Sequence, residues 1–208
     1  MTTLLVIAKE PRPGRVKTRL TPPFSPEQAA ALAEASLADT LHAVARTSAT
    51  RRVLVLDGRP GPWLPPGFDV VPQCAGGLDE RLADAFAHCR GPALLIGMDT
   101  PQVTPALLTV DFAECDAYLG PAEDGGFWAL GLADPDPALL RGVPMSTAET
   151  GAIQRQRLRT AGLRVRDLPR LRDVDTAADA AAVAALVPHG RFAALLNRCT
   201  AGSGTDRR

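Results

Sequence analysis

Leu4-Leu5-Val6-Ile7-Ala8 is the first apolar run of the chain and shows the pattern from which the fold is predicted, and a basic segment follows it at residues 9–20. Every residue of this run is apolar, whereas a strand with one face in water would alternate apolar and polar residues. Similar short runs recur between longer segments rich in alanine. These runs are predicted to be strands, at residues 4–8, 53–56, 93–96, 117–119, 128–132 and 163–168.

The intervening segments are predicted to be helices, because several begin at Ser, Thr or Asp in a capping position. They cover residues 26–45, 79–89, 105–113, 146–161 and 177–186. Apolar strands that alternate with helices indicate an α/β fold, with a mostly parallel central sheet covered by helices on both faces. Ligands of such open sheets bind outside the carboxyl ends of the strands. The residues that follow each strand are therefore the first candidates for a site.

The length of 208 residues suits one α/β domain. We expect this domain to span residues 1–199. Residues 200–208 offer little to bury, since Gly, Ser, Thr and Arg dominate, and are expected to be a disordered tail.

Charge and hydropathy limit the partners of the protein. Lys plus Arg and Asp plus Glu both number 23, so no net field attracts nucleic acid or an anionic membrane. No apolar run approaches the ~20 residues of a membrane span, and no signal segment is visible, which favours a cytoplasmic protein. The four cysteines lie far apart in the sequence and indicate neither a zinc site nor a disulfide framework. The oligomeric state stays open.

The basic segment after the first strand carries five cations in the eleven positions 9–19. Arg forks and Lys ammonium groups are the side chains that bind phosphate oxygens. Lys17 and Arg19 are the first candidates for phosphate contact, and Lys9 and Arg12 come next. An isolated basic run would more often be a solvated turn, but a loop at the carboxyl end of a strand lies where the fold binds its ligand.

Asp99 follows the predicted strand 93–96, with Gly97 and Pro101 beside it. Mg²⁺ takes hard oxygen ligands and keeps waters and substrate phosphates, so one or two carboxylates suffice. Asp99 is therefore a candidate ligand for Mg²⁺ or Mn²⁺. The alternative is a role as cap or turn residue before the helix at Pro105.

Glu123 and Asp124 precede a glycine pair, Gly125 and Gly126, and a returning strand. Such glycines allow a backbone to pass close to a ligand. No histidine is well placed to activate an acceptor hydroxyl, so Asp124 or Glu123 is the candidate general base. A plain Asp-Gly hairpin turn explains the spacing equally well.

Asp175 belongs to a group of three carboxylates in residues 173–179 that precedes the helix at 177–186. Capping of this helix, by Asp175 or Thr176, would use one of these polar side chains. One carboxylate remains free to reach the metal, which makes Asp175 the second candidate ligand.

Gly76 and Gly77 follow an edge strand and open a helix. The free backbone N–H groups there could meet a base or a phosphate. Asp79 as the cap of this helix is the competing interpretation.

Four motifs, at residues 8–20, 97–101, 120–127 and 173–176, together resemble the DUF2064 family of GT-A-like glycosyltransferases. The resemblance also includes Ser146-Thr147 and covers residues 4–187 in order. It implies a three-layer α/β/α GT-A fold of the nucleotide-diphospho-sugar transferase superfamily, related to the molybdopterin and phospholactate guanylyltransferases.

Roles for single residues follow from the same resemblance. Lys17 and Arg19 match the loop that holds nucleotide phosphates. Asp99 matches the metal carboxylate, Asp124 the acid on the acceptor side, and Asp175 the late acidic motif. Two features depart from the usual pattern: residues 76–81 read Gly-Gly-Leu-Asp-Glu-Arg instead of Gly-Asp-Leu-Gly-Glu-Arg, and Asp99 stands alone instead of in an Asp-x-Asp pair.

The preferred function is a glycosyltransferase that acts on a nucleotide sugar and a small-molecule acceptor with Mg²⁺ or Mn²⁺. The first alternative is a nucleotidyltransferase that uses a nucleoside triphosphate and a phosphorylated acceptor. The second is a catalytically silent nucleotide-binding or scaffold protein, since one fold serves many functions. The sequence does not distinguish the base, the sugar or the acceptor.

Overall fold

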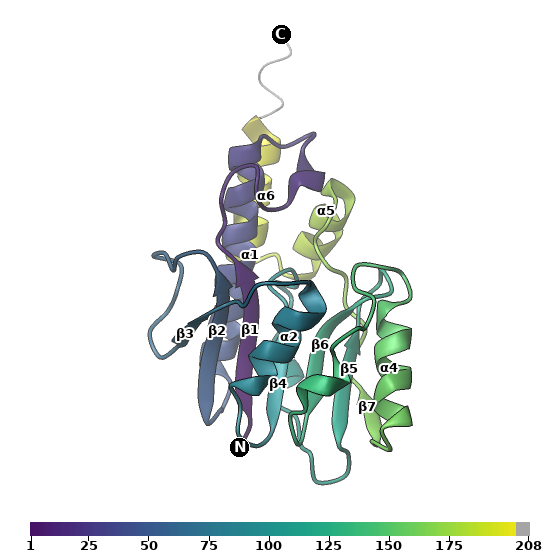
Figure 1. The fold of residues 1–208 in the computed structure, drawn as a ribbon. Helices are drawn as coiled ribbons and strands as arrows, with labels where there is room; N and C mark the ends of the chain where they lie inside the picture. Colours follow the sequence, from purple (N-terminus) through teal and green to yellow (C-terminus); the bar gives the residue numbers. More distant parts are fainter. Residues whose placement is uncertain (203–208) are drawn as a thin grey trace.

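A seven-stranded sheet forms the centre of the protein in a computed structural model that describes residues 1–202 (Figure 1). The strands lie in the order β3-β2-β1-β4-β6-β5-β7. Only β6 runs against its neighbours β4 and β5, and the other pairs are parallel. The strands are β1 (Thr3–Lys9), β2 (Arg51–Asp57), β3 (Asp69–Pro72), β4 (Ala93–Ile96), β5 (Ala117–Pro121), β6 (Phe127–Leu132) and β7 (Val165–Asp167).

Six α-helices and two short 3-10 helices accompany the sheet within residues 1–202. The longest helix, α1, begins at a capping box in which Ser25 and Gln28 exchange side-chain and backbone hydrogen bonds. The helices are α1 (Pro26–Arg46), α2 (Leu78–Ala87), α3 (Pro105–Leu108), α4 (Thr150–Thr160), α5 (Ala177–Leu186) and α6 (Arg191–Gly202), with η1 (Thr18–Leu20) and η2 (Pro137–Leu139). None of these helices is long and apolar enough to cross a membrane.

The sheet buries both of its faces. Leu4 and Val6 of β1 belong to a core cluster with α1 on one face, whereas Leu5 packs with α2 and α4 on the other. This division confirms the three-layer α/β architecture and explains why β1 is apolar at every inner position. Figure 1 shows α1 behind the sheet and α2 in front of it.

A third cluster lies beyond the sheet, where the first half of α1 packs against α5 and α6. Phe192 of α6 is completely buried there. The sequence prediction missed α6. It was wrong at residues 200–202, which form the last turn of that helix and not a disordered tail; residues 203–208 lie outside the described part of the chain.

The ends of β1, β2 and β4 define one edge of the sheet. Lys9 pairs in register with Asp57, and Val6 pairs with Ile96. The backbone after Ile96 therefore leaves the sheet three residues before the end of β1. The loops that follow β1 and β4 meet at this edge, below the cluster formed by α1, α5 and α6 (Figure 1).

Candidate functional site

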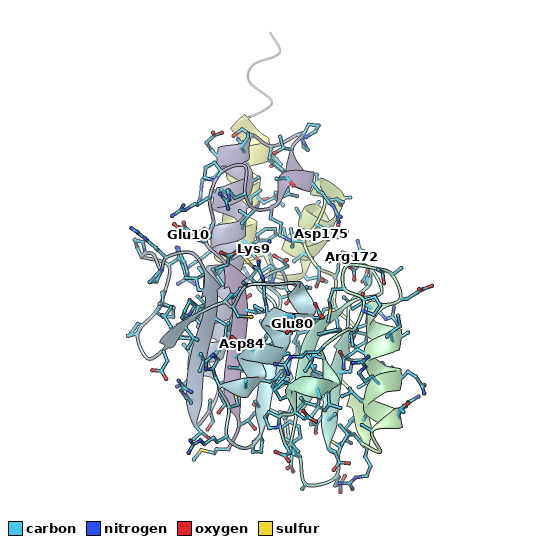
Figure 2. The ribbon with its side chains drawn as sticks, in the orientation of Figure 1. Lys9, Glu10, Glu80, Asp84, Arg172 and Asp175 are labelled. Carbon is cyan, nitrogen blue, oxygen red and sulfur yellow. The ribbon has the colours of Figure 1, made fainter. Side chains whose placement is uncertain are left out.

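A cleft of about 670 Å³ opens at the carboxyl ends of β1 and β4. The charged residues that line the cleft come from segments that are far apart in the sequence. Figure 2 labels two of these residues, Lys9 and Asp175, at this edge of the sheet. Among the residues singled out from the sequence, the cleft brings together Lys9, Lys17, Arg19, Asp99, Asp124 and Asp175. The basic loop and the acidic motifs thus face one crevice.

Lys17 joins the basic loop to two of the acidic motifs. Its Nζ lies 2.9 Å from Oδ1 of Asp99 and 3.0 Å from Oδ1 of Asp175. The lysine side chain is only 8% exposed, and its backbone takes the left-handed conformation with φ of 49°. Burial lowers the pKa of Lys17, but the carboxylates of Asp99 and Asp175 outweigh it and raise the pKa above its usual value. The ammonium is therefore charged at neutral pH.

Hydrogen bonds to backbone carbonyls hold the two acidic loops against each other. The N–H of Val174 donates to the carbonyl of Asp99 at 2.9 Å, and Nε2 of Gln102 donates to the carbonyl of Arg172 at 2.6 Å. Thr104, and not Asp99, caps the following helix α3. The capping alternative for Asp99 is therefore excluded, and its carboxylate is free to face the cleft.

Thr176 caps α5 in a capping box with Asp179. This arrangement leaves Asp175 free of any capping role, so its carboxylate turns toward Lys17. Arg19 lies 3.5 Å from the other oxygen of Asp175, and its side chain is 77% exposed. Arg19 is thus an exposed cation at the mouth of the cleft, where solvent still reaches its charged end.

Asp173 is a site residue that the sequence argument did not single out. It lines the cleft, and its Oδ1 is buried without a hydrogen-bond partner among residues 1–202. Burial, together with the nearby carboxylates of Asp99 and Asp124, raises the pKa of Asp173 to about 7. The group of three acids at 173–179 pointed to this segment, but burial, which distinguishes Asp173 from Asp175, is not visible in a sequence.

Asp124 lies in the loop that joins β5 to β6. Its Oδ1 accepts a hydrogen bond of 2.8 Å from the N–H of Gly126, and both residues line the cleft. Glu123 does not line the cleft and instead forms an ion pair of 2.6 Å with Arg172. The hairpin-turn interpretation and the site interpretation therefore both apply to Asp124.

Gly125 supports this loop from behind. Its φ is +91°, and an added Cβ would overlap the carbonyl of Ala148. The N–H of Gly151 donates to the carbonyl of Gly125 at 2.8 Å. Gly125 lies outside the cleft lining, and it allows the hairpin to pack directly on the turn that precedes α4.

Two other candidate phosphate-binding residues, Arg12 and Gly77, also lie outside the cleft. Arg12 is exposed and pairs with Glu10 at 2.8 Å. Gly77 is the cap of α2, which excludes Asp79 from that role. Gly76 does line the cleft, and its carbonyl accepts a hydrogen bond from Nε of Arg81.

The donor set suits one divalent cation. No group of three or more His, Cys, Asp or Glu side chains in residues 1–202 is arranged to hold a metal. However, oxygens of Asp99 and Asp175 converge on a single positive charge, which the ammonium of Lys17 provides. Two carboxylates satisfy Mg²⁺ or Mn²⁺ when substrate phosphates and waters complete the coordination. Asp99 and Asp175 are therefore the residues that could hold such a metal.

The sheet order and the cleft at its carboxyl edge define the nucleotide-diphospho-sugar transferase fold. A protein from Desulfovibrio desulfuricans G20, described as a candidate nucleotide-diphospho-sugar transferase, superposes with a TM-score of 0.86 and 27% identity over 97% of this chain and 96% of that one. The profile of the DUF2064 family, described as an uncharacterized protein conserved in bacteria, matches residues 30–147. The chain belongs to the DUF2064 family.

Two further solved structures share the fold at lower identity. Rv0371c from Mycobacterium tuberculosis H37Rv, in complex with manganese, has a TM-score of 0.53 and 20% identity over 88% of this chain and 96% of that one. The 2-C-methyl-D-erythritol 4-phosphate cytidylyltransferase of Thermus thermophilus has a TM-score of 0.55 and 16% identity over 90% of this chain and 100% of that one. At these identities the likeness concerns the fold alone. No curated protein matches the sequence.

Proposed function

We propose that the protein is a glycosyltransferase that moves a sugar from a nucleoside-diphosphate sugar to a small acceptor. The observation that carries this proposal is the position of Lys17 between Asp99 and Asp175 inside the cleft. A diphosphate is bound by cationic side chains and a divalent metal by carboxylates, so a site for both needs the two kinds of side chain close together. Lys17, Asp99 and Asp175 meet this requirement. The likeness to the Desulfovibrio protein supports the same substrate class.

The basic loop would hold the diphosphate. Lys9, Lys17 and Arg19 line the cleft, and their charges would neutralise phosphate oxygens. Asp99 and Asp175 would hold Mg²⁺ or Mn²⁺, which when bound neutralises charge on the leaving diphosphate. The manganese in the Rv0371c structure supports the use of a divalent metal in this fold.

Asp124 would activate the acceptor. In the transfer, the acceptor oxygen forms a bond to the anomeric carbon while the bond from that carbon to the diphosphate breaks. The carboxylate of Asp124 takes the proton of the acceptor hydroxyl, and a nucleoside diphosphate leaves. The hydrogen bond from Gly126 holds this carboxylate in the cleft lining. Glu123, paired with Arg172, is less available for this role.

A second candidate is nucleotidyl transfer from a nucleoside triphosphate to a phosphorylated small molecule. The cytidylyltransferase of Thermus thermophilus shares the fold over 90% of this chain, which supports this candidate. The two reactions differ in their products. Glycosyl transfer releases a nucleoside diphosphate, whereas nucleotidyl transfer releases pyrophosphate.

A thermal-shift screen tests the proposed function. Nucleoside-diphosphate sugars and nucleoside triphosphates are added with Mn²⁺, with Mg²⁺ or with EDTA. We expect one nucleotide sugar to raise the melting temperature by several degrees only when metal is present, because binding to the native state stabilises it. Stabilisation by none of them, or by all sugars equally, contradicts the proposal.

Asp99→Asn is the matching variant. It keeps the size of the side chain and removes one metal carboxylate, so we expect the metal-dependent part of the nucleotide shift to disappear. Asp134→Asn, which changes an exposed aspartate, should leave the shift intact. Nucleotide binding that survives in Asp99→Asn, without turnover, would point to a catalytically silent binding protein.

A further inference from the structure

The ammonium of Lys17 lies between Asp99 and Asp175, the two carboxylates that would hold a metal ion in the proposed function. It contacts Asp99 and Asp175 at 2.9 and 3.0 Å, so one positive charge satisfies both carboxylates. The same lysine is assigned to the phosphates in the proposed function. A buried lysine that holds the metal ligands must leave them, at least in part, before a divalent cation can bind.

We propose that Lys17 is a resident counter-cation that competes with the divalent metal for Asp99 and Asp175. In the free protein the ammonium holds the two carboxylates together and weakens their affinity for a metal. The inference rests on the proposed function in one respect, which is that the displaced ammonium of Lys17 then binds a diphosphate. The competition itself concerns this chain and the metal alone.

The ammonium of Lys17 and a divalent cation cannot both lie between Asp99 and Asp175. A divalent cation and an ammonium that contact the same carboxylates would lie within a few ångströms of each other and repel strongly in a partly buried site. Lys17 is 8% exposed, so moving its charge away from both partners without a new anion is unfavourable. Metal alone should therefore bind weakly, and a diphosphate that accepts the ammonium should strengthen metal binding.

The surrounding acids do not remove this competition. Asp124 lines the same cleft, but its Oδ1 already accepts the N–H of Gly126. Asp173 also lines the cleft, but in residues 1–202 it makes no ion pair with Lys17. No other ion pair of Lys17 is present in residues 1–202, so Asp99 and Asp175 are the groups that the metal and the lysine contend for.

The experiment is a Mn²⁺ titration without nucleotide, in which the free ion is followed by its electron paramagnetic resonance signal. Lys17→Met removes the charge and keeps an unbranched side chain. We expect this variant to bind Mn²⁺ at least tenfold more tightly than the wild-type protein. Lys17→Arg retains a cation and should bind Mn²⁺ as weakly as the wild type.

Lys9→Met is the matched control, because Lys9 lines the same cleft but forms no ion pair in residues 1–202. It removes the same charge from the cleft and should change the Mn²⁺ affinity less than threefold. Mn²⁺ affinity of Lys17→Met that equals that of the wild type or of Lys9→Met would overturn the inference.

Thermal unfolding of each variant with and without Mn²⁺ shows whether the variants are folded and gives a second measure. Mn²⁺ should raise the melting temperature of Lys17→Met by more than that of the wild type. The titration contains no nucleotide and needs no turnover. A gain of Mn²⁺ affinity therefore upholds the competition even if no sugar transfer is found, and nucleotide turnover without such a gain leaves only the proposed function standing.

Discussion

Asp173 is a carboxyl that folding places in an unfavourable setting. Burial and the neighbouring carboxylates of Asp99 and Asp124 raise its pKa to about 7, from an ordinary value near 3.8. The folded state therefore holds a proton that the unfolded chain has already lost between these two values. The stability that this group contributes is complete below the ordinary value and is lost as the pH rises through 7.

Asp173→Asn should therefore stabilise the metal-free protein at pH 8 and not at pH 4. We expect a gain at pH 8 of roughly 2 kcal/mol, about 5 °C in melting temperature, because asparagine carries no charge into the buried position. Thermal unfolding in EDTA at the two pH values measures it. Asp134→Asn, at an exposed carboxyl, should show no such dependence, and an equal effect of Asp173→Asn at both pH values would refute the explanation.

At the scale of elements, the β5–β6 hairpin holds Asp124 by packing on the turn before α4. Gly125→Ala should force the two apart, since a Cβ there overlaps the carbonyl of Ala148 in addition to straining a φ of +91°. We expect a loss of about 3 kcal/mol in the free energy of unfolding, measured by urea denaturation.

Gly67→Ala, a variant outside the hairpin, separates the cost of backbone strain from the cost of overlap with Ala148. Gly67 has a φ of +87° and no atom within 4 Å of an added Cβ, so it carries only the backbone strain. Its cost should be about 1 kcal/mol. Equal losses in the two variants would show that the contact with Ala148 is unimportant.

For the molecule as a whole, the cleft exists because loops from distant parts of the sequence meet at one sheet edge. Metal and nucleotide should therefore stabilise the protein together. We expect Mn²⁺ with a nucleoside diphosphate to raise the melting temperature by about 5–10 °C, more than the sum of the two alone, since the displaced Lys17 gains a phosphate partner.

In Lys17→Met, the rise in melting temperature with both ligands should equal the sum of the two separate rises, because this variant has no ammonium that could move from the carboxylates to the phosphate. Differential scanning calorimetry with GDP, CDP and UDP in turn measures the effect. Additive shifts in the wild-type protein would mean that metal and nucleotide bind independently.

The α/β architecture could be predicted from the sequence. Five strands from 4–8 to 128–132 lie within the observed strands, and helix 177–186 matches α5, because apolar periodicity and caps are local signals. Local signals were weaker elsewhere: the helix predicted at 105–113 ends at Leu108, and α6 was missed because its burial depends on packing against α1 and α5.

How the candidate residues meet could not be predicted from the sequence. The motifs predicted a cationic loop and acids at the same edge, and the cleft joins Lys17 to Asp99 and Asp175. The structure alone placed Asp173 inside the cleft and Glu123 outside it. Burial and ion pairing between loops depend on contacts between segments far apart in the chain, and no local pattern in the sequence encodes them.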